Sequence, residues 1–374
     1  MISMTEVKES KVSLGDISVN FLQQMSLTSY KINGDMTSIL AKYNVSISQL
    51  SAHNGRLSIP KYMRIGFDLI QQTQRDDLGL LIGENVCFQH YGMLGFAAMS
   101  APDISTMAQV LAQYESLLSQ NVRGHSTFTP ITNENKHENT NVTTPEPTLS
   151  FYSIAPYNLY NCFVVDSVLA SWFTLLTSRA KHLTQSATTI KTVHIVKAVH
   201  IEYPEPHNSE RYHDFFQCPV IFNSAFNGLV LNSQHLDIPL PDACMSSYLQ
   251  AQQLCHHELN LLQQNQDWQS KVIEKVSHNL VGNMPDINQV AALLGTSPWT
   301  LRRRLYKENT NYQRIMDTTR QGLALSYVRD TLLSFSEISY LLGFATPAAF
   351  YKAFRRWTQS TPKNYRQTVI NKRE

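Results

Sequence analysis

Residues 286–305, DINQVAALLGTSPWTLRRRL, and residues 334–354, SFSEISYLLGFATPAAFYKAF, repeat one pattern that decides the fold of the C-terminal part of the chain. In each copy a short apolar helix ends at Leu-Leu-Gly, and a second helix begins at a hydroxyl residue followed by Pro. Ser297 corresponds to Thr346, and Leu305 corresponds to Phe354, at a constant offset of 49 residues. The sequence therefore predicts one helix-turn-helix module built twice.

Both copies carry matching signals for the start of each helix. Asp286 and Ser334 each stand three residues before a Gln or Glu, which is the spacing of a capping box. Ser297 and Thr346 can cap the second helix of their copy, while the Pro that follows presets φ. The helix boundaries therefore have a local physical cause.

The second helix of the first copy has one apolar and one polar face. Leu301 and Leu305 lie four residues apart and should face the core, which turns Trp299, Arg302 and Arg303 outward together. A B-DNA major groove admits one α-helix, and Arg can form two hydrogen bonds to guanine. We expect this face to read base pairs, although Trp299 also fits a half-buried aromatic that supports the helix.

The second copy has less capacity for base reading. Tyr351 and Lys352 take the equivalent places, beside the small side chains of Ala348 and Ala349. We expect this helix to act more through phosphate contacts and DNA shape. The predicted base contacts are Trp299, Arg302, Arg303, Tyr351 and Lys352, and the predicted phosphate contacts are Ser297, Thr300, Arg304, Thr346, Arg355 and Arg356.

Charge and spacing favour the same interpretation. Residues 271–374 hold 16 Lys and Arg against 7 Asp and Glu, whereas the first 270 residues hold 15 against 22, so a basic tail follows an acidic body. Helical periodicity without Pro predicts one long helix over 312–332. Such a connector would let the two reading helices enter successive major grooves, about 34 Å apart. The predicted target is an asymmetric element with two boxes, about 20 base pairs for each protomer.

The C-terminal motifs carry a family resemblance. The segments LGTSPWTLRRRL at 294–305, LGF at 342–344, FYKAF at 350–354 and TPKNYR at 361–366 together resemble the DNA-binding domain of the AraC/XylS family of bacterial transcription regulators. The family more often has Arg where Trp299 stands, and usually Arg where Lys352 stands. The resemblance implies promoter DNA and RNA polymerase as partners, and we expect an activator, although the sequence does not give the sign of regulation.

The first 270 residues predict a helical region followed by an α+β region. Residues 18–118 have helical apolar stripes, and the polar segment 133–148 predicts a loop between two strands. Strand-like pieces at 193–203, 219–223 and 228–232 surround a short helix at 209–216. The predicted fold class is mainly α, with an α+β N-terminal sensor domain over 18–240. An all-α C-terminal domain over 271–370 would hold two helix-turn-helix motifs joined by a long helix.

This body also resembles a known sensor domain. The segments DLGLLIGE at 77–84, YGMLG at 91–95, SAP at 100–102 and FQCPV at 216–220 resemble the N-terminal domain of the AraC/XylS subgroup of the ornithine-utilisation regulator. The resemblance implies a small-molecule effector, whose binding residues the sequence does not identify, and dimerisation with a second copy. It does not imply the cupin barrel of the arabinose regulator, so a sugar ligand is not inferred.

Catalytic, metal and cofactor sites are not predicted. The sequence has no GxSxG, P-loop, HExxH or zinc-deaminase signature. Acid and base pairing of Asp76 with Asp77, or of Glu202 with Glu205, is less probable than solvated charges at element ends. The five cysteines include no CxxC pair, and Cys255 beside two His on a helix cannot chelate one ion well. With no leader or spanning segment predicted, we expect a cytoplasmic protein with no membrane contact.

The segment 241–270 is predicted to be a linker helix, either exposed on the surface or coupling the two domains. Three hypotheses remain open. The leading one is an effector-responsive transcription regulator, whose N-terminal body biases how the C-terminal domain engages promoter DNA. The second is a regulator without a ligand, whose body only dimerises or contacts polymerase. The third makes the body an enzyme or scaffold that the DNA-binding tail tethers.

Overall fold

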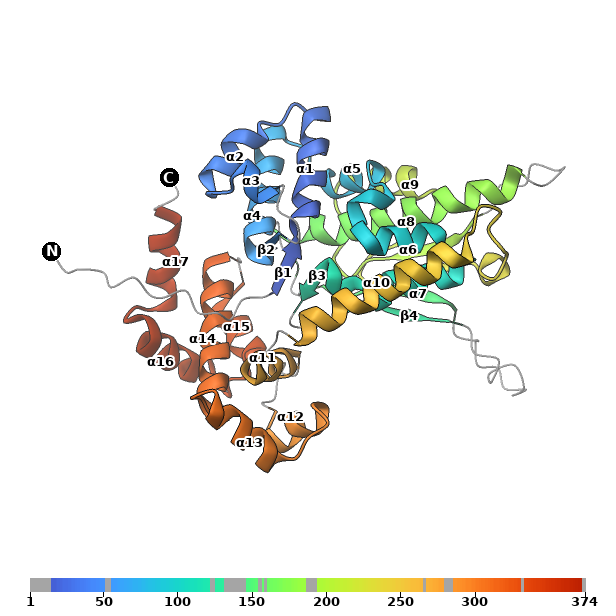
Figure 1. Ribbon diagram of the computed structural model, residues 1–374. Helices are drawn as coiled ribbons and strands as arrows, with labels where there is room; N and C mark the ends of the chain where they lie inside the picture. Colours follow the sequence, from blue (N-terminus) through green and yellow to red (C-terminus); the bar gives the residue numbers. More distant parts are fainter. Residues whose placement is uncertain are drawn as a thin grey trace, which may run out of the picture.

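The computed structural model describes residues 15–50, 55–121, 125–130, 146–153, 157, 160–185, 194–264, 267–278, 285–330 and 333–371. Its buried side chains form three apolar cores, two in the N-terminal body and one in the C-terminal domain. Figure 1 shows the C-terminal domain, in orange and red, against one side of the body. Within these ranges, no helix has the length and apolar character needed to cross a membrane.

The first core belongs to a helical lobe. Its elements are β1 (Gly15–Ser18), α1 (Val19–Lys31), α2 (Met36–Lys42), α3 (Ile47–Leu50), β2 (Arg56–Ser58), α4 (Ile59–Thr73) and α5 (Leu78–Glu84). Leu22, Met25, Ile65 and Leu69 are fully buried at its centre. The predicted helical character of 18–118 is therefore correct for most of this lobe.

A small sheet that the sequence did not predict closes one side of the helical lobe. β1 pairs in antiparallel fashion with β2 and with β3 (Ser119–Asn121), in the order β2-β1-β3. These strands have only three or four residues, too few for an alternation of apolar and polar residues to stand out from a helical pattern. The sheet places β3, at the end of the segment predicted as helical, beside β1 at its beginning.

A second lobe packs five strands against helices. The helical elements are η1 (Phe88–Tyr91), α6 (Gly92–Ser100), α7 (Ile104–Gln113), η2 (Glu115–Leu117), α8 (Cys162–Gln185), α9 (Glu210–Phe216) and η4 (Ser233–His235). The strands are β4 (Thr127–Thr129), β5 (Thr148–Phe151), β6 (Val196–His200), β7 (Val220–Ile221) and β8 (Asn227–Leu231), in the order β4-β5-β8-β6-β7. Only the β6–β7 pair is parallel among these neighbours.

The predicted strands and the short helix of this lobe are confirmed to within three residues at each end. β4 and β5 form the antiparallel pair expected on either side of the polar segment 133–148. Most of that segment, residues 133–145, lies outside the described residues.

Close approach of α5 and α8 joins the two lobes. A Cβ added at Gly79 would lie 2.3 Å from the Cβ of Asp166, and one added at Gly83 would lie 2.2 Å from the Cβ of Ala170. Two glycines one helical turn apart therefore let the backbones of these helices meet. The apolar run at the start of α8 is explained in the same way, because this helix is buried between both lobes.

One acidic side chain of each pair considered as catalytic, Asp77 and Glu202, has structural partners. Asp77 accepts hydrogen bonds from Arg75 at 2.8 Å and is also ion-paired with Arg211, which ties α5 to α9. The Glu202 carboxylate accepts a hydrogen bond from Asn227 at 2.8 Å and one from Tyr157. These contacts give both carboxylates a role in holding the fold.

Helix α10 (Met245–Gln264) packs on the second lobe. Tyr248, Ala251 and Cys255 are buried in the core of that lobe, while Leu254 and Leu261 stay exposed on the other side. Most of the segment predicted as a linker helix is thus part of the N-terminal body. The C-terminal domain begins with α11. Figure 1 shows α10, in gold, running along the body toward α11.

The C-terminal domain is all-helical, as predicted. It consists of α11 (Trp268–His278), α12 (Ile287–Leu293), α13 (Pro298–Lys307), α14 (Tyr312–Asp330), α15 (Phe335–Leu341), α16 (Pro347–Thr358) and α17 (Pro362–Asn371). The long helix α14 contributes Ile315, Met316, Leu323 and Tyr327 to its core. Figure 1 shows α14 between the two motifs, with α13 on one side and α16 on the other.

Candidate DNA interface

The turns of the two helix-turn-helix motifs have the same backbone geometry. Gly295 has φ +60° and Gly343 has φ +66°, the left-handed conformation that glycine adopts without strain. The amide of the next residue then bonds back to the end of the first helix, Thr296 to Ala291 at 2.9 Å and Phe344 to Ser339 at 3.0 Å. The second turn is one residue longer, because the glycines are 48 residues apart and the caps that follow them are 49 apart.

Side-chain caps fix the start of each reading helix. The Ser297 hydroxyl accepts a hydrogen bond from the Thr300 amide at 3.1 Å, and the Thr346 hydroxyl accepts one from the Ala349 amide at 3.2 Å. The two leading helices have the capping boxes that the sequence predicted, at Asp286 and at Ser334. Local sequence therefore determines all four helix starts.

The predicted reading face of α13 is exposed. Leu301 and Leu305 are fully buried, whereas Arg302 and Arg303 are exposed and Trp299 is 65% exposed. The Arg303 guanidinium carbon lies 5.0 Å from the centre of the Trp299 ring. Trp299 is therefore not a half-buried support of the helix in this structure, and its ring orders a cationic side chain on the surface.

The corresponding face of α16 is partly occupied by its own domain. Tyr351 is 38% exposed, and its ring lies edge-on to Phe335 with the ring centres 5.8 Å apart. Lys352 is exposed, beside the exposed small side chains of Ala348 and Ala349. The second motif thus presents one flexible cation where the first presents two arginines.

The residues predicted to contact phosphate fall into different surroundings. Arg355 and Arg356 are exposed at the end of α16. Arg304 is only partly exposed, because its guanidinium lies over the Trp268 ring of α11 at 4.0 Å. The Thr300 hydroxyl is hydrogen-bonded to that of Ser297 at 2.8 Å. Packing of Arg304 on another helix was not foreseen, since Trp268 is 36 residues away in the sequence.

One arginine from α14 holds the second motif together. Arg320 donates from Nε to the Leu342 carbonyl at 3.1 Å and from Nη2 to the Gly343 carbonyl at 2.8 Å. Its guanidinium also lies 4.7 Å from the centre of the Phe344 ring, and burial lowers its pKa. This side chain satisfies carbonyls that the end of α15 leaves without helical partners.

A second arginine, Arg366, bonds backbone carbonyls at the end of α14. Arg366 donates to the Val328 carbonyl at 3.0 Å and to the Leu333 carbonyl at 2.8 Å, with its guanidinium 4.5 Å from the centre of the Phe335 ring. Burial lowers the pKa of Arg366 as well. Part of the basic excess of this domain therefore stabilises helix ends instead of facing outward.

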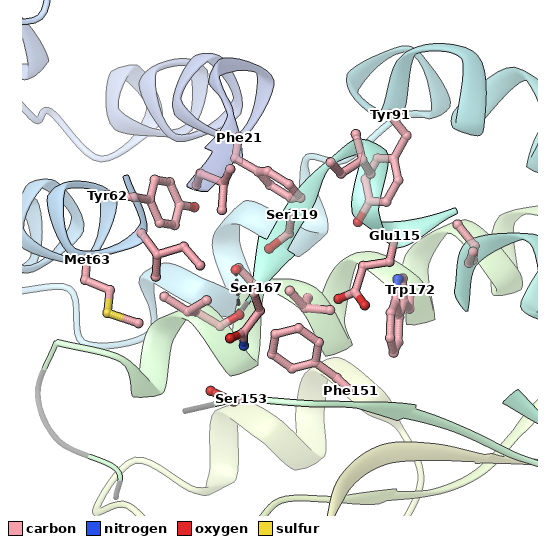
Figure 2. Close-up of a pocket in the computed structure, with 17 residues that line it drawn as sticks. Phe21, Tyr62, Met63, Tyr91, Glu115, Ser119, Phe151, Ser153, Ser167 and Trp172 are labelled. Atoms are coloured by element: carbon pink, nitrogen blue, oxygen red, sulfur yellow. Dashed lines mark hydrogen bonds between the residues drawn. The ribbon is translucent and has the colours of Figure 1, made fainter. Parts of the chain in front are cut away.

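A cavity lies between the two lobes of the N-terminal body. Its walls come from β1, α1 and α4 on one side and from η1, α7, η2, β3, β5 and α8 on the other. The space accessible to the centre of a water molecule is small, about 50 Å³. Figure 2 shows Phe21, Tyr62, Tyr91, Phe151 and Trp172 around it, with Glu115 directed inward. Sequence reasoning missed this cavity because its residues come from six separate segments.

The fold and the paired basic helices define a helix-turn-helix DNA-binding protein. A model of the arabinose-binding domain of the AraC transcription regulator matches residues 34–240, and a helix-turn-helix domain model matches residues 290–368. The chain belongs to the AraC family of transcription regulators, and it is a DNA-binding regulator, not an enzyme. The resemblance drawn from the sequence is therefore confirmed.

Similar proteins match either most of this chain or a small part of it. The ornithine utilization regulator of Pseudomonas aeruginosa is 26% identical over 85% of this chain and 86% of its own length. The urease operon transcriptional activator of Escherichia coli is 35% identical, over 21% of this chain and 27% of its own length. Among solved structures, the transcriptional regulator CdpR of Pseudomonas aeruginosa covers 91% of this chain and 98% of its own, with 18% identity and a TM-score of 0.39.

Proposed function

We propose that this chain is an effector-responsive transcription activator, in which a small molecule bound in the N-terminal body sets how the C-terminal domain occupies promoter DNA. The observation that carries the DNA part is the pair of capped helices, α13 and α16, whose exposed basic faces flank one long helix. The observation that supports the effector part is the cavity between the lobes.

The two motifs would divide the reading of one asymmetric site. Trp299, Arg302 and Arg303 of α13 would contact bases in one major groove, and Tyr351 with Lys352 of α16 would enter the next. Ser297, Thr300, Arg304, Thr346, Arg355 and Arg356 would fix the register on phosphates, together with the N-termini of both helices. The site would therefore hold two boxes about one helical turn apart.

The structure offers a short path from the cavity to the DNA-binding domain. One face of α4 lines the cavity with Ile59, Tyr62 and Met63, and α4 also contacts α14. Lys61 and Arg64 of α4 share a surface cleft with Arg329 of α14. A ligand that moves α4 would thus act on the helix that holds the two motifs at a fixed separation.

Two further partners belong to the same proposal. RNA polymerase would be recruited beside the bound element. A second copy of the chain could pack along α10, where Leu249, Leu254 and Leu261 are 48%, 48% and 44% exposed. Replacement of Leu254 and Leu261 with Glu should then shift the protein to a monomer in sedimentation equilibrium. An unchanged mass would remove α10 from the dimer interface.

The first experiment selects DNA from a random library with the purified full-length protein, followed by sequencing of the retained molecules. An asymmetric element with two boxes would support the proposed division of the site. Recovery of only salt-sensitive, sequence-independent binding would mean either that specific binding requires the effector or that the C-terminal domain lacks a reading function. The selected element, placed before a reporter gene, then tests activation.

The alternative, a regulator that needs no ligand, makes a different prediction for the domain junction. A flexible insertion near Asn265 should leave DNA binding intact and remove any response to effector if the N-terminal body controls the DNA-binding domain. A reporter that is active without added ligand, and equally active with the insertion, would favour the alternative.

A further inference from the structure

The cavity between the lobes has mostly aromatic walls. Tyr62, Tyr91 and Trp172 are 2%, 3% and 3% exposed, and the rings of Phe21 and Phe151 complete the enclosure. Phe21 lies edge-on to Tyr91 with ring centres 6.0 Å apart, and Phe151 lies edge-on to Trp172 at the same distance. Several ring faces and edges therefore converge on one small volume, as in sites that bind organic cations.

One carboxyl group faces this aromatic space. Glu115 keeps some exposed surface, although protein atoms surround its carboxyl group on nearly all sides, and it lines the cavity. Oε2 accepts a hydrogen bond from the Ser126 amide at 2.6 Å. Burial raises the pKa of Glu115 to about 7. In Figure 2 its carboxyl group, the Tyr91 hydroxyl and the Trp172 indole nitrogen face the same space.

The described residues that line the cavity include no Lys, Arg or His, and Glu115 is their only carboxyl group. The buried Tyr62 hydroxyl, in the same wall, has no hydrogen-bond partner within hydrogen-bond geometry. A carboxylate without a cation, and a buried hydroxyl oxygen that accepts no hydrogen bond, are costly in an apolar cavity. One bound ammonium group would pair with the carboxylate and donate to that oxygen.

We propose that this cavity is the effector site and that it binds an organic ammonium ion with a compact apolar body, held by Glu115 and by the surrounding aromatic rings. The assignment rests on the proposed effector response and adds the chemical class of the effector. The ammonium group pairs with the Glu115 carboxylate, and the apolar body fills the space between Phe21, Phe151 and Trp172. A zwitterionic amino acid should bind more weakly, because its carboxylate would meet no cation among the described walls.

The small size of the cavity limits the size of the ligand and requires the two lobes to move when a ligand binds. Only about 50 Å³ is accessible to the centre of a water molecule, which is room for a few waters. A ligand with an aromatic ring therefore enters only if the lobes separate slightly. Since α4 forms one wall and touches α14, that separation reaches the DNA-binding domain.

Isothermal titration of the full-length protein with three probes of similar shape tests the ligand class. Benzylamine carries the ammonium group, benzyl alcohol replaces it with a neutral hydroxyl, and phenylglycine adds a carboxylate. We expect benzylamine to bind at one site, and the other two to bind at least about tenfold more weakly, as loss of a charge-assisted hydrogen bond implies.

Two variants locate that binding. Glu115→Gln keeps the acceptor for the Ser126 amide and should weaken benzylamine binding by about tenfold or more. Glu205→Gln, at an exposed position outside the cavity, should leave it unchanged. Equal binding of benzyl alcohol, unchanged binding by Glu115→Gln, or no binding of benzylamine would each overturn the proposed class.

A separate readout distinguishes this inference from the proposed function. Transcription from the selected DNA element is measured with and without benzylamine. Binding that depends on Glu115 but leaves transcription unchanged would support the cation site and contradict the effector response. A response to a neutral or anionic compound, with no benzylamine binding, would retain the effector response and overturn the ligand class.

Discussion

The two helix-turn-helix motifs share their turns and caps but differ in where their arginines lie. In the first motif Arg302 and Arg303 are exposed on the reading face of α13. On the corresponding face α16 has Lys352, while Arg320 of α14 and Arg366 of α17, which lie outside the motif, bond backbone carbonyls inside the domain. The two motifs thus keep the same turn and cap geometry while the residues on their exposed faces differ.

The difference indicates that the two motifs contribute differently to sequence preference and to affinity for DNA. Arg302 and Arg303 can make bidentate contacts to guanine, which discriminate between bases. Lys352 presents a single charged group on a flexible chain, which suits a phosphate as well as a base. We therefore predict that sequence preference resides mainly in the box under α13, and that the box under α16 contributes affinity.

The largest effect is expected from breaking the buried support of the second motif. Arg320→Ala removes two charge-assisted hydrogen bonds to the end of α15 and should destabilise the C-terminal domain by about 2–4 kcal/mol. Urea denaturation followed by tryptophan fluorescence measures this change. Arg355→Ala, at an exposed position, is the control and should change stability by less than about 0.5 kcal/mol. Equal stability of the two variants would mean that Arg320 does not hold the motif.

The next effect tests base reading. Arg303→Ala should weaken binding to the selected element by about 1–3 kcal/mol and relax the preference at one base pair. Lys352→Ala is the matched change in the second motif and should cost less than about 1 kcal/mol, with the base preference kept. Competition binding against elements with single base changes measures both. A larger loss of preference from Lys352→Ala would reverse the proposed division.

The helix caps should show no difference between the two motifs, because the same kind of cap begins α13 and α16. Ser297→Ala and Thr346→Ala each remove one hydrogen bond to a helix start and should each cost about 1 kcal/mol of domain stability. Thermal unfolding of the two variants measures these costs. A clear difference between the two losses of stability would show that the longer second turn changes how much the Thr346 cap stabilises α16.

The smallest effect concerns charge alone. Arg356→Ala should weaken binding to all DNA sequences alike by less than about 1 kcal/mol, and should reduce the slope of log affinity against log salt by about one. Binding measured at several salt concentrations tests this expectation. Unequal weakening of specific and nonspecific DNA would instead assign Arg356 a role in base reading.

The sequence by itself determined the local features of this protein. Both motifs, their four helix starts and the long helix α14 were predicted with near-correct ends, because caps, glycines and apolar spacing act within a few residues of each other. Outward placement of Trp299, Arg302 and Arg303 followed from helical periodicity alone. The strands of the second lobe were recognised for the same reason.

Only the tertiary structure decided which distant residues meet. The sheet of β1, β2 and β3, the packing of α10 on the body and the carbonyls bonded by Arg320 and Arg366 all depend on contacts between remote segments. The cavity around Glu115 has the same origin, since its walls come from both lobes. Local sequence fixes a helix because its hydrogen bonds span four residues, whereas a cavity or a side-chain clamp exists only after the chain has packed on itself.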